Sequence, residues 1–231
     1  MYAVLFDIDG TLIQTGGAGQ LAFAETFAAE FGVPVLSGSI PFAGRSDRAI
    51  SMDLMRTHGV DVTEANWRRF LDGYLERLPS ALGRRDGRVL PGVPELLDRI
   101  AALDNPLVGI LTGNVQAGAG HKLSYYGLKE RFAFGGYGDA SIERSEIAAS
   151  AVAEARRYGA AQYGNGNELS GAMVIGDTVH DISCARAVGA LAVAVPTGGT
   201  NREELAAASP DLLLDDLTDA EPLLELIQRK L

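Results

Sequence analysis

The chain has little cysteine, no long apolar run and no excess of positive charge. Its single cysteine, Cys184, excludes an internal disulfide, as is typical of proteins from a reducing compartment. No apolar run approaches the ~20 residues that a membrane helix requires. No basic segment precedes the short apolar run at the N-terminus, so we expect neither a membrane partner nor a secretory signal. These absences predict a cytoplasmic protein.

Acidic residues outnumber basic ones by 30 to 20, which gives a formal net charge of −10. This balance argues against a nucleic-acid partner and against an anionic membrane surface. The three histidines, His58, His121 and His180, do not have the spacing of zinc ligands. The glycine-rich stretch at 16–19 lacks the Lys-Ser/Thr ending of a phosphate-binding loop. Hydrophobic residues make up 47% of the chain, enough to build a buried core, so general disorder is excluded.

The apolar run at the N-terminus ends in two aspartates. Residues 2–6 are typical of a strand that is buried on both faces, as in a parallel sheet. Asp7 and Asp9 follow at its carboxyl end, where open α/β sheets hold their ligands, and alternation directs both side chains to the same side. Two carboxylates that lie close together on the same side repel each other unless a cation or a proton lies between them. The alternative is an ordinary turn, in which Asp and Gly are common.

The remaining pattern divides into a helical stretch and an alternating one. Residues 16–88 show only helical spacing, and their aromatic side chains are predicted to form the core of a small bundle. The helices expected there cover residues 20–31, a stretch from Ser46 or Asp47 to Met55, and a stretch capped by Thr63 that ends at about Leu78. From about residue 89, helices alternate with strands predicted at 106–111, 132–134, 172–175, 191–195 and 212–214. Residues 162–170 are predicted to form a surface loop.

This order predicts an α/β fold, a Rossmann-like parallel sheet that is interrupted after its first strand by a helical insert. The expected boundaries are 1–15 and 89–231 for the α/β core, and 16–88 for the insert. There are no internal repeats.

Three of the predicted strands end in polar residues of complementary chemistry. They end in Asp7 and Asp9, in Thr112-Gly113-Asn114, and in Asp177 with Asp181 close behind. In a parallel sheet these ends meet at one edge. Carboxylates around one point suit a hard cation such as Mg²⁺. A cation that offsets their repulsion leaves one carboxylate able to attack a phosphoryl group, whose oxygens Thr112 and nearby N–H groups would hold.

These segments resemble a known family. Phe6-Asp7-Ile8-Asp9-Gly10-Thr11-Leu12, Leu111-Thr112-Gly113-Asn114 and Ile175-Gly176-Asp177-Thr178-Val179-His180-Asp181-Ile182 resemble motifs one, two and four of the haloacid dehalogenase superfamily. The resemblance covers nearly the whole chain. The insert is similar to the helical cap of phosphoglycolate-phosphatase-like and β-phosphoglucomutase-like members. The resemblance implies a Mg²⁺-dependent phosphatase that hydrolyses a small phosphorylated metabolite through an aspartyl-phosphate.

The resemblance also implies roles for individual residues. Asp7 would be the nucleophile and Asp9 the general acid and base. Mg²⁺ would be held by Asp7, the backbone carbonyl of Asp9 and Asp177, with Asp181 near or behind it. Dehalogenases of the superfamily lack an acid at the position of Asp9, so its presence favours phosphoryl transfer. Two alternatives stay open: a phosphomutase, which needs the same core residues, and a non-catalytic binding module, against which the complete acid set argues.

Motif three of the family, usually a Lys followed by Pro, has no counterpart in this sequence. A cation beside the phosphoryl group is electrostatically needed, and Arg144 and Lys122 are the candidates. Lys122 lies about two turns into a predicted helix and is expected to point away from the site, so we favour Arg144. In the insert, Arg45 is a candidate to bind an anionic substrate, or an exposed charge at a helix start. Gly16, Gly17 and Gly19 are predicted to form a hinge. The substrate and the oligomeric state do not follow from the sequence.

Overall fold

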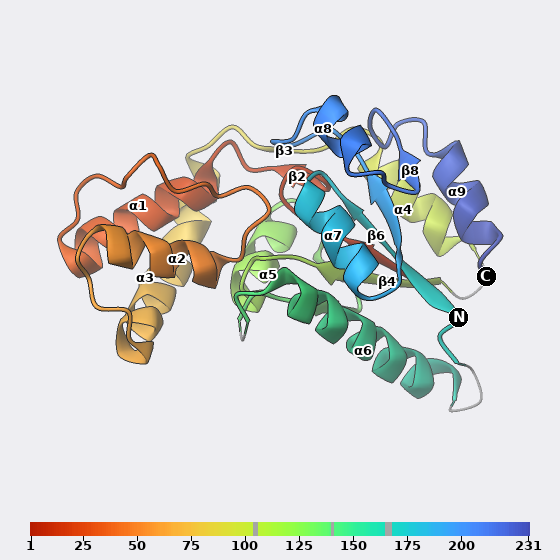
Figure 1. Cartoon of the computed structure of the whole chain (residues 1–231), viewed down its shortest axis with the longest axis horizontal. Coiled ribbons are helices and arrows are strands. Elements are labelled where there is room, and N and C mark those ends of the chain that lie inside the picture. Colours follow the sequence, from red (N-terminus) through yellow and green to blue (C-terminus); the bar gives the residue numbers. More distant parts are fainter. Residues whose placement is uncertain (104–105, 140, 165–167) are drawn as a thin grey trace.

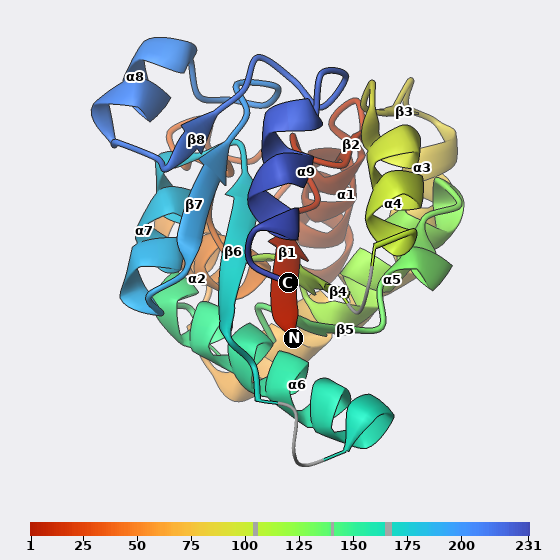
Figure 2. The same cartoon turned by 90° about the vertical axis from the view of Figure 1, so that its right-hand side faces the viewer.

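The larger part of the chain is a six-stranded parallel sheet with helices on both faces (Figure 1, Figure 2). The computed structural model describes residues 1–103, 106–139, 141–164 and 168–231. The strand order is β5-β4-β1-β6-β7-β8. The strands of this sheet are β1 (Tyr2–Phe6), β4 (Pro106–Leu111), β5 (Phe134–Gly136), β6 (Gly171–Gly176), β7 (Leu191–Ala194) and β8 (Leu212–Leu213). The predicted α/β class is confirmed.

Strand β1 lies in the middle of the sheet, because β4 and β6 pair with it on either side. Its register is set by Tyr2, which lies opposite both Pro106 and Gly171. Alternate side chains of β1 enter two different cores: Val4 and Phe6 pack on one face, and Ala3 and Leu5 pack on the other. Every residue of the strand is buried, as its unbroken apolar run predicts.

Two layers of helices cover the sheet. The face that holds Val4 and Phe6 packs against α4 (Val93–Ala101), α5 (Gln116–Tyr125) and α9 (Glu221–Gln228). The opposite face packs against α6 (Arg144–Tyr163), α7 (Val179–Ala187) and α8 (Arg202–Ala207). A short 3-10 helix, η1, covers Lys129–Arg131. None of the helices among the described residues is long and apolar enough to cross a membrane.

A bundle of three helices lies beyond one end of the sheet, on the left of Figure 1, and both chain termini lie at the other end. The helices are α1 (Ala18–Phe31), α2 (Asp47–Thr57) and α3 (Glu64–Gly83). The side-chain oxygens of Ser46 and Thr63 cap α2 and α3, as serine and threonine do at helix starts. In the core of the bundle, the ring of Phe70 packs edge to face with Phe23 and at a tilt against Phe27.

The bundle differs from the sequence-based expectation in two places. Helix α3 was expected to end at about Leu78 but continues through Pro79 to Gly83. Burial of Ala81 and Leu82 in the bundle core offsets the cost of a proline inside a helix, which is about 3 kcal/mol. The two connections to the sheet also pair with each other as antiparallel strands, β2 (Ile13–Gln14) and β3 (Arg88–Val89). Strands of two residues carry no periodicity from which to predict them.

The predicted surface loop at 162–170 is partly outside the described residues, because it includes 165–167. Helix α6 continues as far as Tyr163, so its end includes the first two residues of the predicted loop.

Candidate active site

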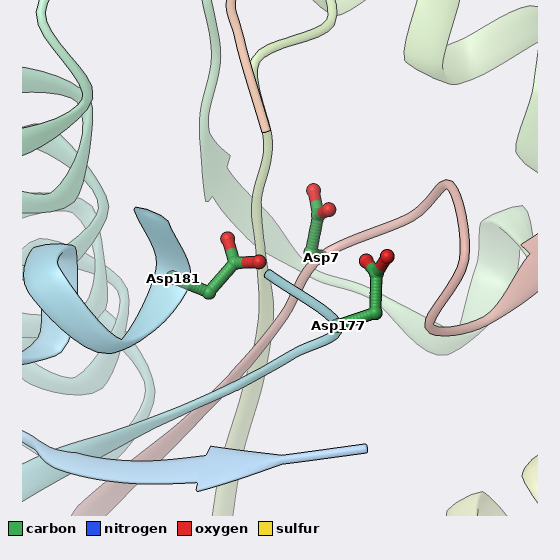
Figure 3. A group of neighbouring side chains, drawn as sticks. All are labelled: Asp7, Asp177 and Asp181. Carbon is green, nitrogen blue, oxygen red and sulfur yellow. The ribbon is translucent and has the colours of Figure 1, made fainter. Parts of the chain in front are cut away.

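Three buried aspartates meet at the carboxyl ends of β1 and β6. Asp7 follows β1, Asp177 follows β6, and Asp181 reaches toward them from the first turn of α7 (Figure 3). One carboxylate oxygen from each lies within 4.8 Å of the other two. The three residues are only 6%, 3% and 2% exposed. The adjacent strand ends therefore bring Asp7 together with two acids that come about 170 residues later in the chain, as the parallel sheet requires.

This group of acids carries more negative charge than its surroundings balance. Burial and then the neighbouring carboxylate of Asp181 raise the pKa of Asp7 well above its ordinary value, although Arg144 opposes the shift. Burial and Asp181 also raise the pKa of Asp177 to about 7. A set of carboxylate oxygens with unbalanced charge fits a hard divalent cation.

Close packing around Asp177 fixes its carboxylate. Gly10 adopts a positive φ of 85°, and a Cβ at this position would lie 2.5 Å from an Asp177 oxygen; a Cβ at Gly198 would lie 1.7 Å from it. The backbone N–H of Gly199 donates to Asp177 at 3.2 Å, and the Thr11 hydroxyl donates to it at 3.3 Å. Sequence reasoning missed the contribution of Gly198 and Gly199, because a glycine pair after a strand is also an ordinary turn.

Arg144 is the cation nearest to the buried acids. It is the first residue of α6, and its guanidinium donates to Asp181 and lies 4.0 Å from an oxygen of Asp7. Burial alone would lower the pKa of Arg144, but the carboxylates of Asp181 and Asp7 raise it above its ordinary value. Asp181 is further held by Thr178, which forms a capping box with it at the start of α7.

Lys122 also enters the site, which contradicts the expectation that it points away. Its ammonium group donates to Asp9 at 2.5 Å and to the side-chain oxygen of Asn114 at 2.6 Å. Side chains on a helix tilt toward its N-terminus, and the long lysine stem therefore reaches back along α5 to the strand ends. The prediction that Lys122 points away considered only its position along the helix axis and not the reach of its side chain.

The Thr112-Gly113-Asn114 segment connects these groups. The amide nitrogen of Asn114 donates to Asp9 and to the Thr112 hydroxyl oxygen, both at 2.8 Å. Thr112 is fully buried. Gly113 lies against the insert: a Cβ there would come within 2.2 Å of the backbone oxygen of Arg45, and its own carbonyl accepts a bond from the Asp47 N–H. The structure thus places Thr112 and Asn114 beside the acids, while Gly113 provides the close approach of the insert.

A cavity of about 450 Å³ lies between the strand ends and the helical insert. Asp7, Asp9 and Asp177 line its floor. Arg45 lines it from the insert, but its guanidinium is paired with Asp53 at 2.5 Å and also donates to the carbonyl of Pro41. The predicted candidate for gripping an anionic substrate is therefore already engaged by a carboxylate of its own helix region.

Two further residues of the cavity were not predicted to contribute to the site. Asp47 is buried, and its carboxylate accepts a bond from the N–H of Val115 at the start of α5. Tyr74 is buried, and its hydroxyl has no hydrogen-bond partner among the described residues. Asp47 reads as a helix-capping residue and Tyr74 as a core aromatic, so no sequence signal distinguishes them from structural residues.

Two carboxylates occupy the N–H groups at the start of α5. Asp47 accepts from the N–H of Val115, and Asp139 accepts from the N–H of Gln116 at 2.7 Å. The two carboxylates satisfy donors that the helix leaves unpaired, and they suit the positive end of its dipole.

A comparison of the sequence with models of protein families shows the family to which the chain belongs. Residues 4–186 match the model of the haloacid dehalogenase-like hydrolases, which is most of the chain. The chain belongs to this family. The resemblance seen in the three motifs is thereby confirmed.

Curated relatives align over nearly the whole chain of this hydrolase. Phosphoglycolate phosphatase from Synechococcus elongatus is 28% identical over 221 residues, covering 95% of both chains. Phosphoglycolate phosphatase from Agrobacterium fabrum is 24% identical and covers 95% of this chain and 91% of that protein.

Solved structures share the fold of this hydrolase. CbbY from Rhodobacter sphaeroides, in complex with phosphate, superimposes with a TM-score of 0.72 at 20% identity, over 95% of this chain and 96% of that one. A hydrolase from Pseudomonas syringae gives a TM-score of 0.70 at 23% identity, over 98% and 99% of the two chains.

Proposed function

We propose that this protein is a Mg²⁺-dependent phosphatase that hydrolyses a small phosphorylated metabolite through an aspartyl-phosphate on Asp7. The observation that carries the proposal is the placement of Asp7, Asp177 and Asp181 within 4.8 Å of one another, with Asp7 and Asp177 lining a cavity that is open to solvent. The curated relatives are named as phosphatases of a small phosphorylated acid, which supports the same reaction class. The protein is accordingly a phosphoric monoester hydrolase.

The metal would be held by the three buried carboxylates and would supply positive charge beside the phosphoryl oxygens. The donor set, which consists of oxygens alone, supports this fit. The raised pKa values of Asp7 and Asp177, which follow first from burial and then from the neighbouring carboxylate of Asp181, support it as well. Mg²⁺ is the proposed ion because it takes oxygen ligands and keeps some of its waters.

In the first step, a carboxylate oxygen of Asp7 bonds to phosphorus while the bond from phosphorus to the leaving oxygen breaks. Asp9 gives its proton to that leaving oxygen, which departs as an alcohol. Its carboxyl is placed for this work by Asn114 and Lys122, at 2.8 and 2.5 Å. Arg144 offsets the negative charge of Asp7 and Asp181 from behind.

In the second step, a water oxygen bonds to phosphorus and the bond between phosphorus and Asp7 breaks. Asp9, now ionised, takes the proton of that water, so both carboxyls return to their starting states and inorganic phosphate leaves. The side chain of Asp9 is 40% exposed, more than that of Asp7, which gives it access to the cavity water that the buried acids lack.

The proposal is tested with p-nitrophenyl phosphate and with a panel of phosphorylated metabolites. We expect phosphate release that disappears with a chelator and returns with Mg²⁺. Asp9→Asn should lower kcat by at least about 10²-fold, as loss of a general acid does, with an unchanged circular dichroism spectrum. Asp219→Asn, at an exposed position outside the cavity, is the matched control.

Two results would overturn the assignment. Phosphatase activity retained in Asp9→Asn would remove its role as acid and base. Isomerisation of a sugar phosphate without net phosphate release would identify a phosphomutase instead.

A further inference from the structure

The cavity offers an unusual set of charges to the part of the substrate that leaves. Among the residues that the structure describes, five aspartates and three cations line it. Each cation is already in contact with a carboxylate: Arg45 with Asp53, Lys122 with Asp9, and Arg144 with Asp181. A negatively charged leaving group would therefore enter a cavity in which every lining cation of the described chain is engaged.

The insert contributes apolar and aromatic side chains and one buried carboxylate to the cavity, besides the polar side chains of Gln20, Arg45 and the exposed Asp86. Phe23, Phe42, Ile50 and Tyr74 line it together with Asp47. Asp47 is 7% exposed and has no ion-pair partner in contact among the described residues. It also occupies the N-terminus of α5 through the N–H of Val115, which is where an anionic group of a ligand would otherwise be stabilised.

The hydroxyl of Tyr74 is a second polar group that indicates a ligand. Its hydroxyl is buried without a partner in the described chain, a condition that costs free energy unless a ligand or water satisfies it. Burial and then the carboxylates of Asp47 and Asp9 raise the pKa of Tyr74 well above its ordinary value, so the hydroxyl stays neutral and keeps its proton. Beyond the reacting acids, the cavity thus presents the buried, neutral hydroxyl of Tyr74 and the buried carboxylate of Asp47.

We propose that the substrate is a phosphomonoester whose leaving group is uncharged and carries a hydroxyl, which Asp47 and Tyr74 recognise. The hydroxyl donates to the Asp47 carboxylate, and its oxygen accepts from the Tyr74 hydroxyl, while the carbon skeleton lies against Phe23 and Phe42. A carboxylate in the same place faces Asp47 as a like charge, which selects against it. This proposal rests on the proposed phosphatase function and separates the chain from relatives that are named for a carboxylate-bearing substrate.

The test uses two matched phosphomonoesters with Mg²⁺, 2-phosphoglycolate and 2-hydroxyethyl phosphate, which differ in a terminal carboxylate against a terminal hydroxymethyl group. We expect kcat/KM to be about 100-fold higher for 2-hydroxyethyl phosphate, because juxtaposed like charges cost several kcal/mol. p-Nitrophenyl phosphate serves as the reference substrate. If none of the three is hydrolysed, the proposed function fails; if they are hydrolysed but the ratio is below about tenfold, this inference alone fails.

Variants assign the preference to individual atoms. Asp47→Asn keeps an oxygen that accepts from the N–H of Val115 but removes the charge, and it should lower the ratio by about tenfold by improving 2-phosphoglycolate. Asp72→Asn, an exposed residue of α3, removes the same charge outside the cavity and should leave the ratio unchanged. An unchanged ratio in Asp47→Asn, or the same shift in Asp72→Asn, overturns the role of Asp47.

Tyr74→Phe removes only the hydroxyl. It should lower kcat/KM for 2-hydroxyethyl phosphate by about fivefold, the effect of one hydrogen bond, with a smaller change for p-nitrophenyl phosphate. Tyr125→Phe, at a tyrosine that is 53% exposed, is the control. Equal losses for both substrates in Tyr74→Phe would show that the hydroxyl does not contact the leaving group.

Discussion

Arg144 and Lys122 are both buried cations in contact with carboxylates of the site, but they reach them from opposite faces of the sheet. Arg144 begins α6 and contacts Asp181, a residue that is 2% exposed. Lys122 belongs to α5 and contacts Asp9, whose side chain is 40% exposed in the cavity. Arg144 thus offsets charge that is buried from water, whereas Lys122 contacts a carboxyl that faces the cavity and that we propose exchanges protons with substrate and water. We propose that these two cations together take the place of the family's motif-three lysine.

The largest expected effect comes from removing the buried cation. Arg144→Met leaves Asp7 and Asp181 without a countercharge, and we expect the free energy of unfolding to fall by about 3–5 kcal/mol, as it does when one partner of a buried pair is removed. Urea denaturation in metal-free buffer measures it, and added Mg²⁺ should recover part of the loss because it binds the folded state.

Arg157→Met is the control on the same helix. Arg157 pairs with Glu154 at the surface, where its side chain is 79% exposed, so its loss should cost less than about 1 kcal/mol. Equal losses in the two variants would contradict the assignment of Arg144 to buried charge balance.

Removing the other cation should act on the reaction more than on the fold. Lys122→Met keeps the apolar stem that packs in α5, and Asp9 keeps its contact with water, so we expect only a small change in the free energy of unfolding. Because Asp9 loses the ammonium group that positions it, kcat should fall by about 10²-fold, equivalent to about 3 kcal/mol of barrier. Phosphate release at saturating substrate measures it.

Lys129→Met, at an exposed position of η1, is the matched control and should change neither quantity. If Lys122→Met unfolds the protein as strongly as Arg144→Met while sparing kcat in the remaining folded fraction, the contrast between the two cations disappears.

Asp47 extends the comparison, because no cation contacts its carboxylate among the described residues. Its effect on the free energy of unfolding is the smallest of those that we expect. Burial raises the pKa of Asp47 to about 6, with Lys122 opposing the shift, so between its ordinary value and 6 the folded protein binds a proton more readily than the unfolded chain. Its contribution to stability therefore falls as the pH rises, by about 1 kcal/mol between roughly pH 5 and pH 7.

Asp47→Asn lacks this contribution, so its unfolding free energy should gain about 1 kcal/mol relative to the wild type over the same interval. Urea denaturation at both pH values measures the difference, with Asp72→Asn as the control for a solvated aspartate. A constant difference between Asp47→Asn and the wild type across this interval would exclude a buried, titrating Asp47.

Much of the fold followed from local pattern. The apolar run at 2–6 predicted a strand buried on both faces, and the alternation after residue 89 predicted its parallel neighbours; both were confirmed. The polar residues at the strand ends also converge, because parallel strands place their carboxyl ends at one edge. The assigned roles of these residues stay predictions until the variants are measured.

What the sequence missed depends on directions and neighbours rather than on residue type. The side chain of Lys122 points along the axis of α5 toward Asp9, although its position in the helix suggested that it was remote. Arg45, a predicted substrate-binding residue, lines the cavity but is paired with Asp53, eight residues away. Neither contact follows from periodicity, since both are made by long side chains that cross between turns or elements.

By itself, the sequence determined the parallel sheet, the helical insert and the meeting of the acids, since hydrophobic period and strand order fix which residues end at which edge. Tertiary structure alone decided which charges are paired and which are left. Solvent exposure and the distance between side chains set the energy of a charge, and both arise only when the insert packs over the strand ends. For that reason the Tyr74 hydroxyl lacks a hydrogen-bond partner, and the Asp47 carboxylate lacks an ion-pair partner, within the part of the chain that the structure describes. These two groups carry the proposal about the substrate.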